Sequence, residues 1–127
     1  MYHYTFFTQK TTAKLLRDLV EAFMNEEFKL LWQFELHQRL EEKGFFPKRK
    51  QTILEVCNPD EASSILGFNP LVAYFLPCKI LITEEAGYTS IGFLRPTKLI
   101  KLTKDQRAIE KAKEIEDRLI AALKRAV

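Results

Sequence analysis

The chain has 127 residues, of which 46% are hydrophobic and 29% are charged, and its formal net charge is +3. This length and composition are typical of one globular domain, so we expect a single domain over residues 1–127. The 20 cationic side chains are nearly balanced by 17 anionic ones. That balance argues against the dense basic surface of a dedicated nucleic-acid-binding protein.

The cysteines and the apolar stretches indicate the compartment. Two cysteines are too few for the disulfide framework of a small secreted domain. The chain does not open with a charged segment followed by an apolar one, so no signal peptide is expected. The most apolar stretch, ILGFNPLVAYFLPCKILI, is interrupted by Asn69, Pro70, Pro77 and Lys79, so no membrane span is expected. We therefore predict a cytoplasmic protein.

Hydrophobic periodicity predicts secondary structure in the order β-α-β-α-β-α-α-β-β-α. Runs rich in aromatic and β-branched residues predict strands over residues 2–9, 28–36, 51–57, 78–84 and 88–94. Helices are expected from Thr11 or Thr12 to Phe23, and over 37–44, 59–67 and 70–75. A single helical turn over 96–102 and a long helix from about Gln106 complete the chain. The fold class that follows is α+β, a two-layer sandwich of a five-stranded mixed sheet and about four helices.

Caps and turns mark several of these boundaries. Asn58 has the position of an N-cap, with Pro59 as the first helical residue and Glu61 as a capping-box partner. Thr103 with Gln106 predicts a second capping box before the last helix. The buried side of that helix is predicted from its spacing to be Ala108, Ala112, Ile115, Leu119, Ala122 and Leu123.

The second strand predicts one buried and one wetter face. Its larger apolar residues are Phe28, Leu30, Trp32, Phe34 and Leu36, opposite Lys29, Gln33 and Glu35. The far face of the sheet is expected to be half apolar, with Phe7, Leu31, Leu54 and Leu81 on it. Because exposed apolar faces often become oligomer contacts, we expect a homodimer.

Three segments together resemble a known family. They are VCNPDEA, ILGFNPLVAYFLPCKILI and IGFLRPTKLI, preceded by the strand-then-helix segment FKLLWQFELHQRLEEKG. This pattern, from about Thr11 to Ile100, resembles the family catalogued as domain of unknown function 302. The resemblance implies a compact α+β domain with a mixed sheet, often dimeric, and it implies no reaction. Ala73 departs from the glycine that members often carry before the aromatic residue.

Cys57 and Cys78 are candidate functional residues. Cys57 ends a strand just before a helix N-terminus, a setting that can lower a thiol pKa and create a nucleophile. Cys78 follows Pro77 and begins the next strand. If the third and fourth strands are antiparallel, the two thiols lie at the same edge of the sheet. The parallel arrangement, which is usual for a strand-helix-strand connection, would place them at opposite ends and argues against a pair. Two small buried core residues are the alternative. No metal site is expected, because there is no C-x-x-C motif and His3 and His37 are far apart.

A possible anion site lies after the fifth strand. Arg95 offers a bidentate fork, and Thr97 and Lys98 open a helical turn that adds further donors. With the Asn58 cap they could hold a phosphate or carboxylate, or they could form a solvated loop. No phosphate loop or dinucleotide fingerprint occurs, so no cofactor is expected.

The sequence favours no enzyme class. It predicts non-catalytic binding of a small anionic ligand near the CNP and LPC motifs. The residues predicted to form this site are Cys57, Asn58, Pro59, Pro77, Cys78, Arg95, Thr97 and Lys98. The alternative is a thiol-dependent redox or sulfur-handling protein that uses Cys57 or Cys78.

Overall fold

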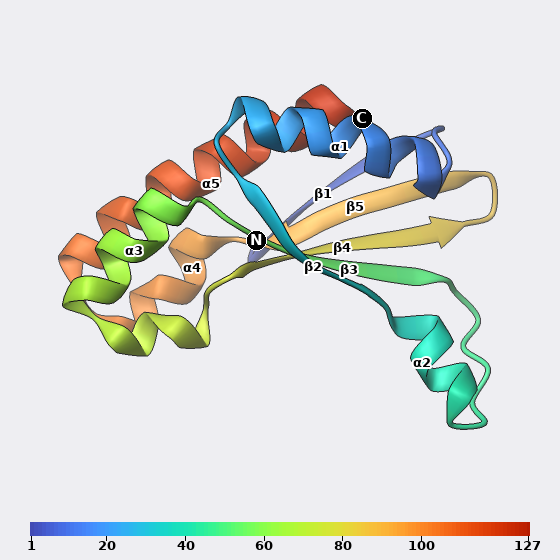
Figure 1. Ribbon diagram of the computed structural model, residues 1–127, viewed down its shortest axis with the longest axis horizontal. Helices are drawn as coiled ribbons and strands as arrows, with labels where there is room; N and C mark the ends of the chain where they lie inside the picture. The colour runs from blue at the N-terminus through green and yellow to red at the C-terminus, as the bar shows by residue number, and fades with distance from the viewer.

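The computed structural model describes residues 1–127 as an α+β fold, with helices packed on one face of a five-stranded sheet (Figure 1). The order confirms the predicted succession, although there are five α-helices instead of about four. The elements are β1 (His3–Thr8), α1 (Thr12–Asn25), β2 (Lys29–Glu35), α2 (Leu36–Glu42), β3 (Gln51–Cys57), α3 (Pro59–Phe68), η1 (Pro70–Tyr74), β4 (Cys78–Glu85), β5 (Tyr88–Leu94), α4 (Pro96–Ile100), η2 (Lys101–Thr103) and α5 (Gln106–Ala126).

The sheet is antiparallel throughout, with the strand order β1-β5-β4-β3-β2. The prediction of a mixed sheet is therefore wrong, and the reason lies in the connection between β3 and β4. The helices of this connection, α3 and η1, lie beyond the end of the sheet (Figure 1). The chain therefore enters β4 at the same end of the sheet at which it leaves β3, and the connection does not cross a face of the sheet. The hairpin between β4 and β5 is confirmed, and Gly87 at its turn has a φ of +87°.

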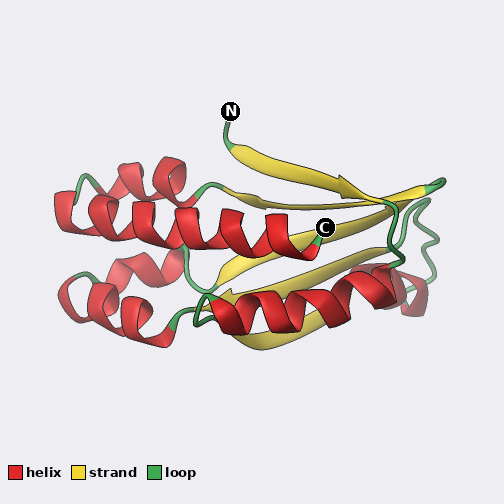
Figure 2. Cartoon of the chain, turned by 90° about the horizontal axis from the view of Figure 1, so that it is seen from above, coloured by secondary structure: helices red, strands yellow, loops and turns green.

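Helices α1 and α5 form the layer over the sheet and pack side by side (Figure 2). The predicted apolar side of α5 is confirmed, since all six of its residues are buried. Inward-facing residues of β3, β4 and β5 meet these helices. Leu54 is among them, which corrects its expected place on the far face. The N-terminal half of α5 extends past the sheet and lies beside α3 and α4 (Figure 2).

Strand β2 is oriented differently from the prediction. Trp32 is 54% exposed, and it pairs in register with Glu55 on the sheet face that carries no helices. A register shift between Leu30 and Trp32 changes the alternation within the strand. Because β2 is an edge strand, its larger apolar residues gain little burial. Only Phe28, just before the strand, is fully in the core.

Two of the predicted N-caps are confirmed and one is wrong. The Thr11 side chain accepts from the Lys14 N–H, and Asn58 accepts from the Glu61 N–H. Helix α5 is capped by Asp105, whose side chain accepts from two backbone N–H groups. Thr103 instead ends η2, where its hydroxyl donates to the Ile100 carbonyl oxygen. The predicted capping box of Thr103 and Gln106 does not form, because Asp105 lies closer to the first free N–H groups of α5.

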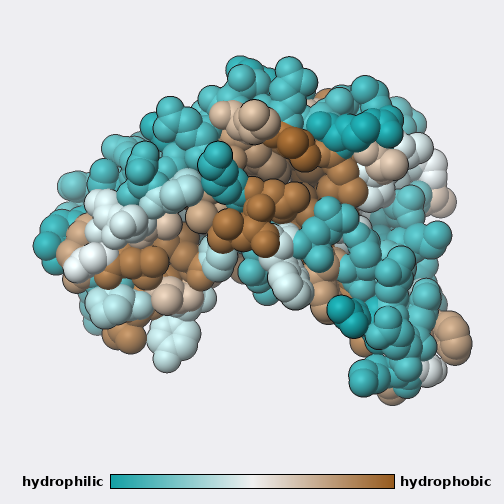
Figure 3. Space-filling view, viewed as in Figure 1, coloured by the Kyte–Doolittle hydropathy of each residue, from teal (hydrophilic) through white to brown (hydrophobic).

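The face of the sheet without helices, here called the open face, lies in the hollow of an arch. Helices α3 and α4 project beyond the sheet at one end, and α2 projects at the other (Figure 1). In the space-filling view, the outline is hollowed between these two projections, and apolar surface gathers over β2 and over the α3 end (Figure 3). No helix combines the length and the apolar character needed to cross a bilayer. The exposed apolar residues of the open face include Phe7, Leu81, Tyr88 and Leu94.

Candidate functional site

The two cysteines lie at the same end of the sheet, where β3 ends and β4 begins. Val56 of β3 pairs with Cys78 of β4, so the end of one strand lies beside the start of the next. The antiparallel pairing overturns the expectation that a parallel arrangement would separate them. Val56 and Cys78 are buried toward the helices, and alternation along β3 directs Cys57 to the opposite face. A disulfide between side chains that point apart would require the backbone to move.

Burial raises the pKa of both thiols. At Cys78, loss of hydration is the main cause and the neighbouring Cys57 adds to it, which raises the pKa to about 12. At Cys57, burial alone raises the pKa. The first turn of α3, expected to stabilise a thiolate, is capped instead by Asn58, whose Oδ1 accepts from the Glu61 N–H at 3.1 Å. Neither thiol has the depressed pKa of an activated nucleophile.

We expect slow and ordered alkylation of the two thiols. At pH 8, a thiol with a pKa of about 12 is ionised in about one molecule in ten thousand, so Cys78 should label only on unfolding. The partly exposed Cys57 should label first, and faster as pH rises. Intact mass after iodoacetamide, with Cys57→Ser and Cys78→Ser variants, separates the two. Fast labelling of Cys78 in the folded protein at pH 7 would contradict this assignment.

The raised pKa of Cys78 also determines how its contribution to the free energy of unfolding changes with pH. The unfolded thiol ionises near pH 9.0, whereas the folded thiol stays protonated until about 12. Its contribution to the free energy of unfolding is therefore complete below pH 9 and decreases as pH rises through this window.

The predicted anion-binding residues Arg95 and Thr97 bind a carboxylate of the chain itself. Glu116 of α5 is 4% exposed. Its Oε2 accepts from Nε and Nη2 of Arg95 at 3.3 and 3.2 Å. Its Oε1 accepts from the N–H and the hydroxyl of Thr97 at 3.1 and 2.7 Å. The Arg95 guanidinium also lies over the Tyr4 ring, 4.8 Å from its centroid. This network fastens α4 to α5 and leaves no free fork for an external anion.

The other predicted residues of the anion site lie apart from one another. Lys98 is exposed on α4. Asn58 is buried, and its Nδ2 has no hydrogen-bond partner. Asn58 and Pro59 line a shallow hollow beside Lys29, far along the chain from Arg95. The structure therefore does not unite Asn58 with Arg95, Thr97 and Lys98 around one ligand.

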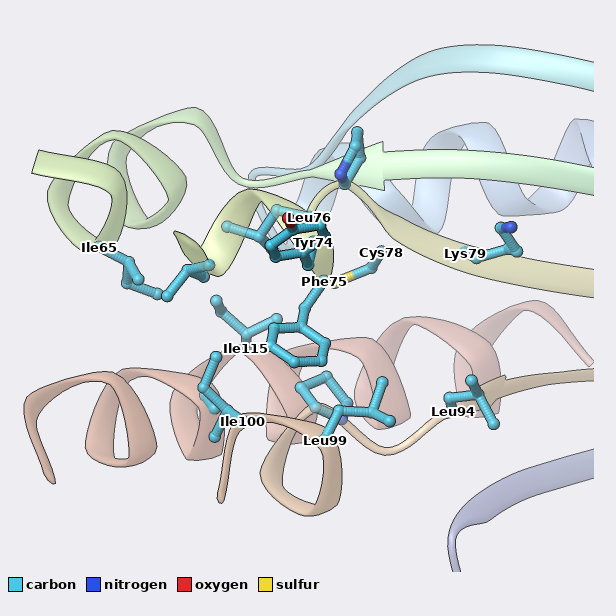
Figure 4. A pocket seen from close by; sticks show the side chains of 14 residues that line it. Ile65, Tyr74, Phe75, Leu76, Cys78, Lys79, Leu94, Leu99, Ile100 and Ile115 are labelled. Carbon is cyan, nitrogen blue, oxygen red and sulfur yellow. The ribbon is translucent and has the colours of Figure 1, made fainter. Parts of the chain in front are cut away.

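An apolar cavity lies behind the LPC motif, between α3, η1, α4 and the N-terminal half of α5 (Figure 4). Its volume is about 180 Å³. Pro77 and Cys78 form part of its wall, and Phe75 and Leu99 approach from opposite sides (Figure 4). Lys79 is the one charged residue of the lining. The remaining lining residues are Ile65, Val72, Tyr74, Leu76, Leu94, Pro96, Ile100, Ala112 and Ile115.

Both the sequence and the fold of this chain match a known protein family. A family model described as "Domain of unknown function DUF302" matches residues 4–126. The chain belongs to the DUF302 family. A crystal structure described as an uncharacterized conserved protein DUF302 from Bacillus stearothermophilus is 42% identical to it. The alignment covers 100% of this chain and 99% of that one, with a TM-score of 0.95. No curated protein matches the chain.

In this DUF302 domain, the predicted site residues divide into two groups. Pro77 and Cys78 reach the cavity, whereas Cys57, Asn58, Pro59, Arg95, Thr97 and Lys98 do not line it. Sequence reasoning missed Glu116, although a carboxylate beside the apolar stripe of α5 could have signalled a buried partner. It also missed Lys79 as the cation nearest the cavity, because a strand lysine is ordinarily a solvated residue.

Proposed function

We propose that this DUF302 domain is a non-catalytic module that binds a small organic ligand in the cavity behind Leu76, Pro77 and Cys78. The observation that carries the proposal is the cavity itself, which is lined mainly by apolar side chains of α3, η1, β4, β5, α4 and α5. Small-molecule sites are usually preformed concave spaces of this kind, with few polar groups in the lining.

The cavity suits a compact ligand. An apolar cavity of about 150 Å³ can stay dry and bind benzene, so a volume of about 180 Å³ accommodates a six-membered ring. Pro96, Leu99 and Ile100 of α4 form one wall. Glu116 supports that wall by binding Arg95 and Thr97, at the start of α4. These two predicted site residues thus act as positioning residues in the proposal.

Filling the cavity should abolish binding. We expect Ala112→Leu to weaken binding of the neutral aromatic probe phenylacetamide at least about tenfold, since the buried Ala112 lines the cavity and leucine occupies its space. Chemical shifts of backbone amides measure the affinity, and native mass spectrometry detects any retained molecule.

Ala121→Leu is the matched control, because Ala121 lies exposed on the same helix. It should bind the probe as the unmodified protein does. The proposal fails if the unmodified protein binds no probe and retains no ligand, or if Ala112→Leu folds and binds normally.

The alternative, a thiol-dependent redox or sulfur-handling function, has less support. Cys78 contributes to the cavity wall, but burial raises the pKa of both thiols and the two side chains point to different faces. The presence of two unpaired thiols supports the cytoplasmic compartment that we propose.

We also propose that two copies of the chain associate through their open faces. Phe7, Leu81 and Tyr88 supply the exposed apolar surface. The charges on this face balance, since Glu55 stands opposite Lys79 and Glu85 binds Arg49, so two copies can meet without net repulsion.

A charge in the centre of the open face should separate the two copies. We expect Leu81→Lys to be monomeric by light scattering, whereas Leu102→Lys, on the exposed element η2, should keep the mass of two chains. A dimeric Leu81→Lys protein would exclude this face as the contact.

A further inference from the structure

A second hollow adjoins the apolar cavity on the open face of the sheet. It has a volume of about 350 Å³. Its lining comes from β1, β4 and β5 and the residue before β1: Tyr2, His3, Thr5, Lys79, Leu81, Ser90, Gly92, Phe93 and Leu94. Gly92 has no side chain to occupy this floor, and a Cβ added there would overlap the Tyr4 carbonyl oxygen and crowd the Thr5 side chain of β1.

The hollow and the cavity share two lining residues, Lys79 and Leu94. The alternation of β4 explains this arrangement, because Cys78 faces the helical side and Lys79 faces the open side. Figure 4 shows Lys79 and Leu94 on the same side of the cavity, away from Ile65. A ligand that reached past these two residues from the cavity would have one part in each space.

The two spaces differ in chemistry. The cavity is mainly apolar, whereas the hollow adds the polar side chains of His3, Thr5 and Ser90. Neither lining contains an aspartate or a glutamate, and Lys79 is the one charged residue common to both. Lys79 forms no ion pair, although Glu55 stands opposite it in register. A buried or half-buried anion beside Lys79 would therefore meet a free cation and no competing carboxylate in the lining.

We propose that the ligand is a small monocarboxylic acid with a ring-sized apolar group, which places the ring in the cavity and the carboxylate beside Lys79 in the open-face hollow. This inference rests on the proposed function and names the class of its ligand. It moves the predicted anion contact from Arg95, which Glu116 occupies, to Lys79, which forms no ion pair.

The test compares phenylacetate with phenylacetamide, which have similar shapes and differ in charge. We expect the unmodified protein to bind phenylacetate about tenfold more tightly, because a hydrogen bond to a charged group is stronger than one between neutral groups. Lys79→Gln should remove this preference while keeping the affinity for phenylacetamide. Chemical shifts of His3 and Ser90 should move with phenylacetate and much less with the amide.

Lys98→Gln is the matched control, since Lys98 is an exposed lysine near the cavity that lines neither space. It should retain the preference for the acid, and Glu55→Gln should retain or increase it. If both probes bind equally to the unmodified protein, or if Lys79→Gln keeps the preference, the inference is overturned and the proposed function stands. If neither probe binds and no ligand is retained, the proposed function itself fails.

Discussion

Replacing Glu116 with alanine is expected to lower the free energy of unfolding by about 3–5 kcal/mol, because the change breaks a buried ion pair by removing one partner. The Glu116 carboxylate accepts four hydrogen bonds, two from Arg95 and two from Thr97. Without it, the Arg95 guanidinium, whose side chain is 22% exposed, and the Thr97 N–H lose their acceptor. Urea denaturation followed by circular dichroism measures the loss.

Glu110→Ala provides the matched control on the same helix. Glu110 is exposed and takes part in no ion pair, so its replacement should change the free energy of unfolding by less than about 0.5 kcal/mol. A loss below about 1 kcal/mol for Glu116→Ala would show that the network contributes little to stability. Loss of the α4 wall should also weaken binding of phenylacetamide in the cavity.

Gly92→Ala is the second substitution with a large expected effect. A Cβ at this position would overlap the Tyr4 carbonyl oxygen and lie 2.8 Å from Thr5 Oγ1. The first of these is a backbone atom, so β1 would have to move away from β5 at the register position where Thr5 pairs with Gly92. We expect a loss of about 2–3 kcal/mol, as for other overpacked sites, measured by thermal or urea unfolding.

Gly67→Ala is the same chemical change, but we expect it to raise the free energy of unfolding. Gly67 lies within α3, and nothing lies within 4 Å of an added Cβ. Alanine is favoured over glycine in a helix, and Gly67 lies in the last turn of α3, so this variant should gain about 0.5 kcal/mol. Equal effects of the two substitutions would mean that the contact between β1 and Gly92 is not what determines the loss.

Much of the fold was predictable because its signals are local. Asn58 and Pro59 encode the start of α3 through their own backbone and side chain, and Gly87 encodes the hairpin turn. The face of β2 was not predictable in this way. Alternation shows that Trp32 and Phe34 share a face, but which face is buried depends on where α1 and α5 come to lie. The direction of β4 was missed for the same reason, since a helical connection permits both directions.

The candidate site was predictable only in part. The LPC motif drew attention to Pro77 and Cys78, and both residues line the cavity. Arg95 was recognised as an anion-binding side chain, and it does bind a carboxylate, but that carboxylate belongs to Glu116. The sequence shows that the Arg95 guanidinium can bind a carboxylate. It does not show that Glu116, 21 positions later, already occupies this guanidinium.

The strand order has a consequence for folding during synthesis on the ribosome. Strands β2, β3 and β4 are neighbours in sequence as well as in the sheet, so they can pair in the order in which they are made. Strand β1 pairs only with β5, so none of its partner residues exists until Thr89 has been made. We therefore expect the sheet to form from the β2 edge and to be completed by β1. Helix α5 follows β5 in the chain, so we expect it to pack on the sheet after β5 has formed.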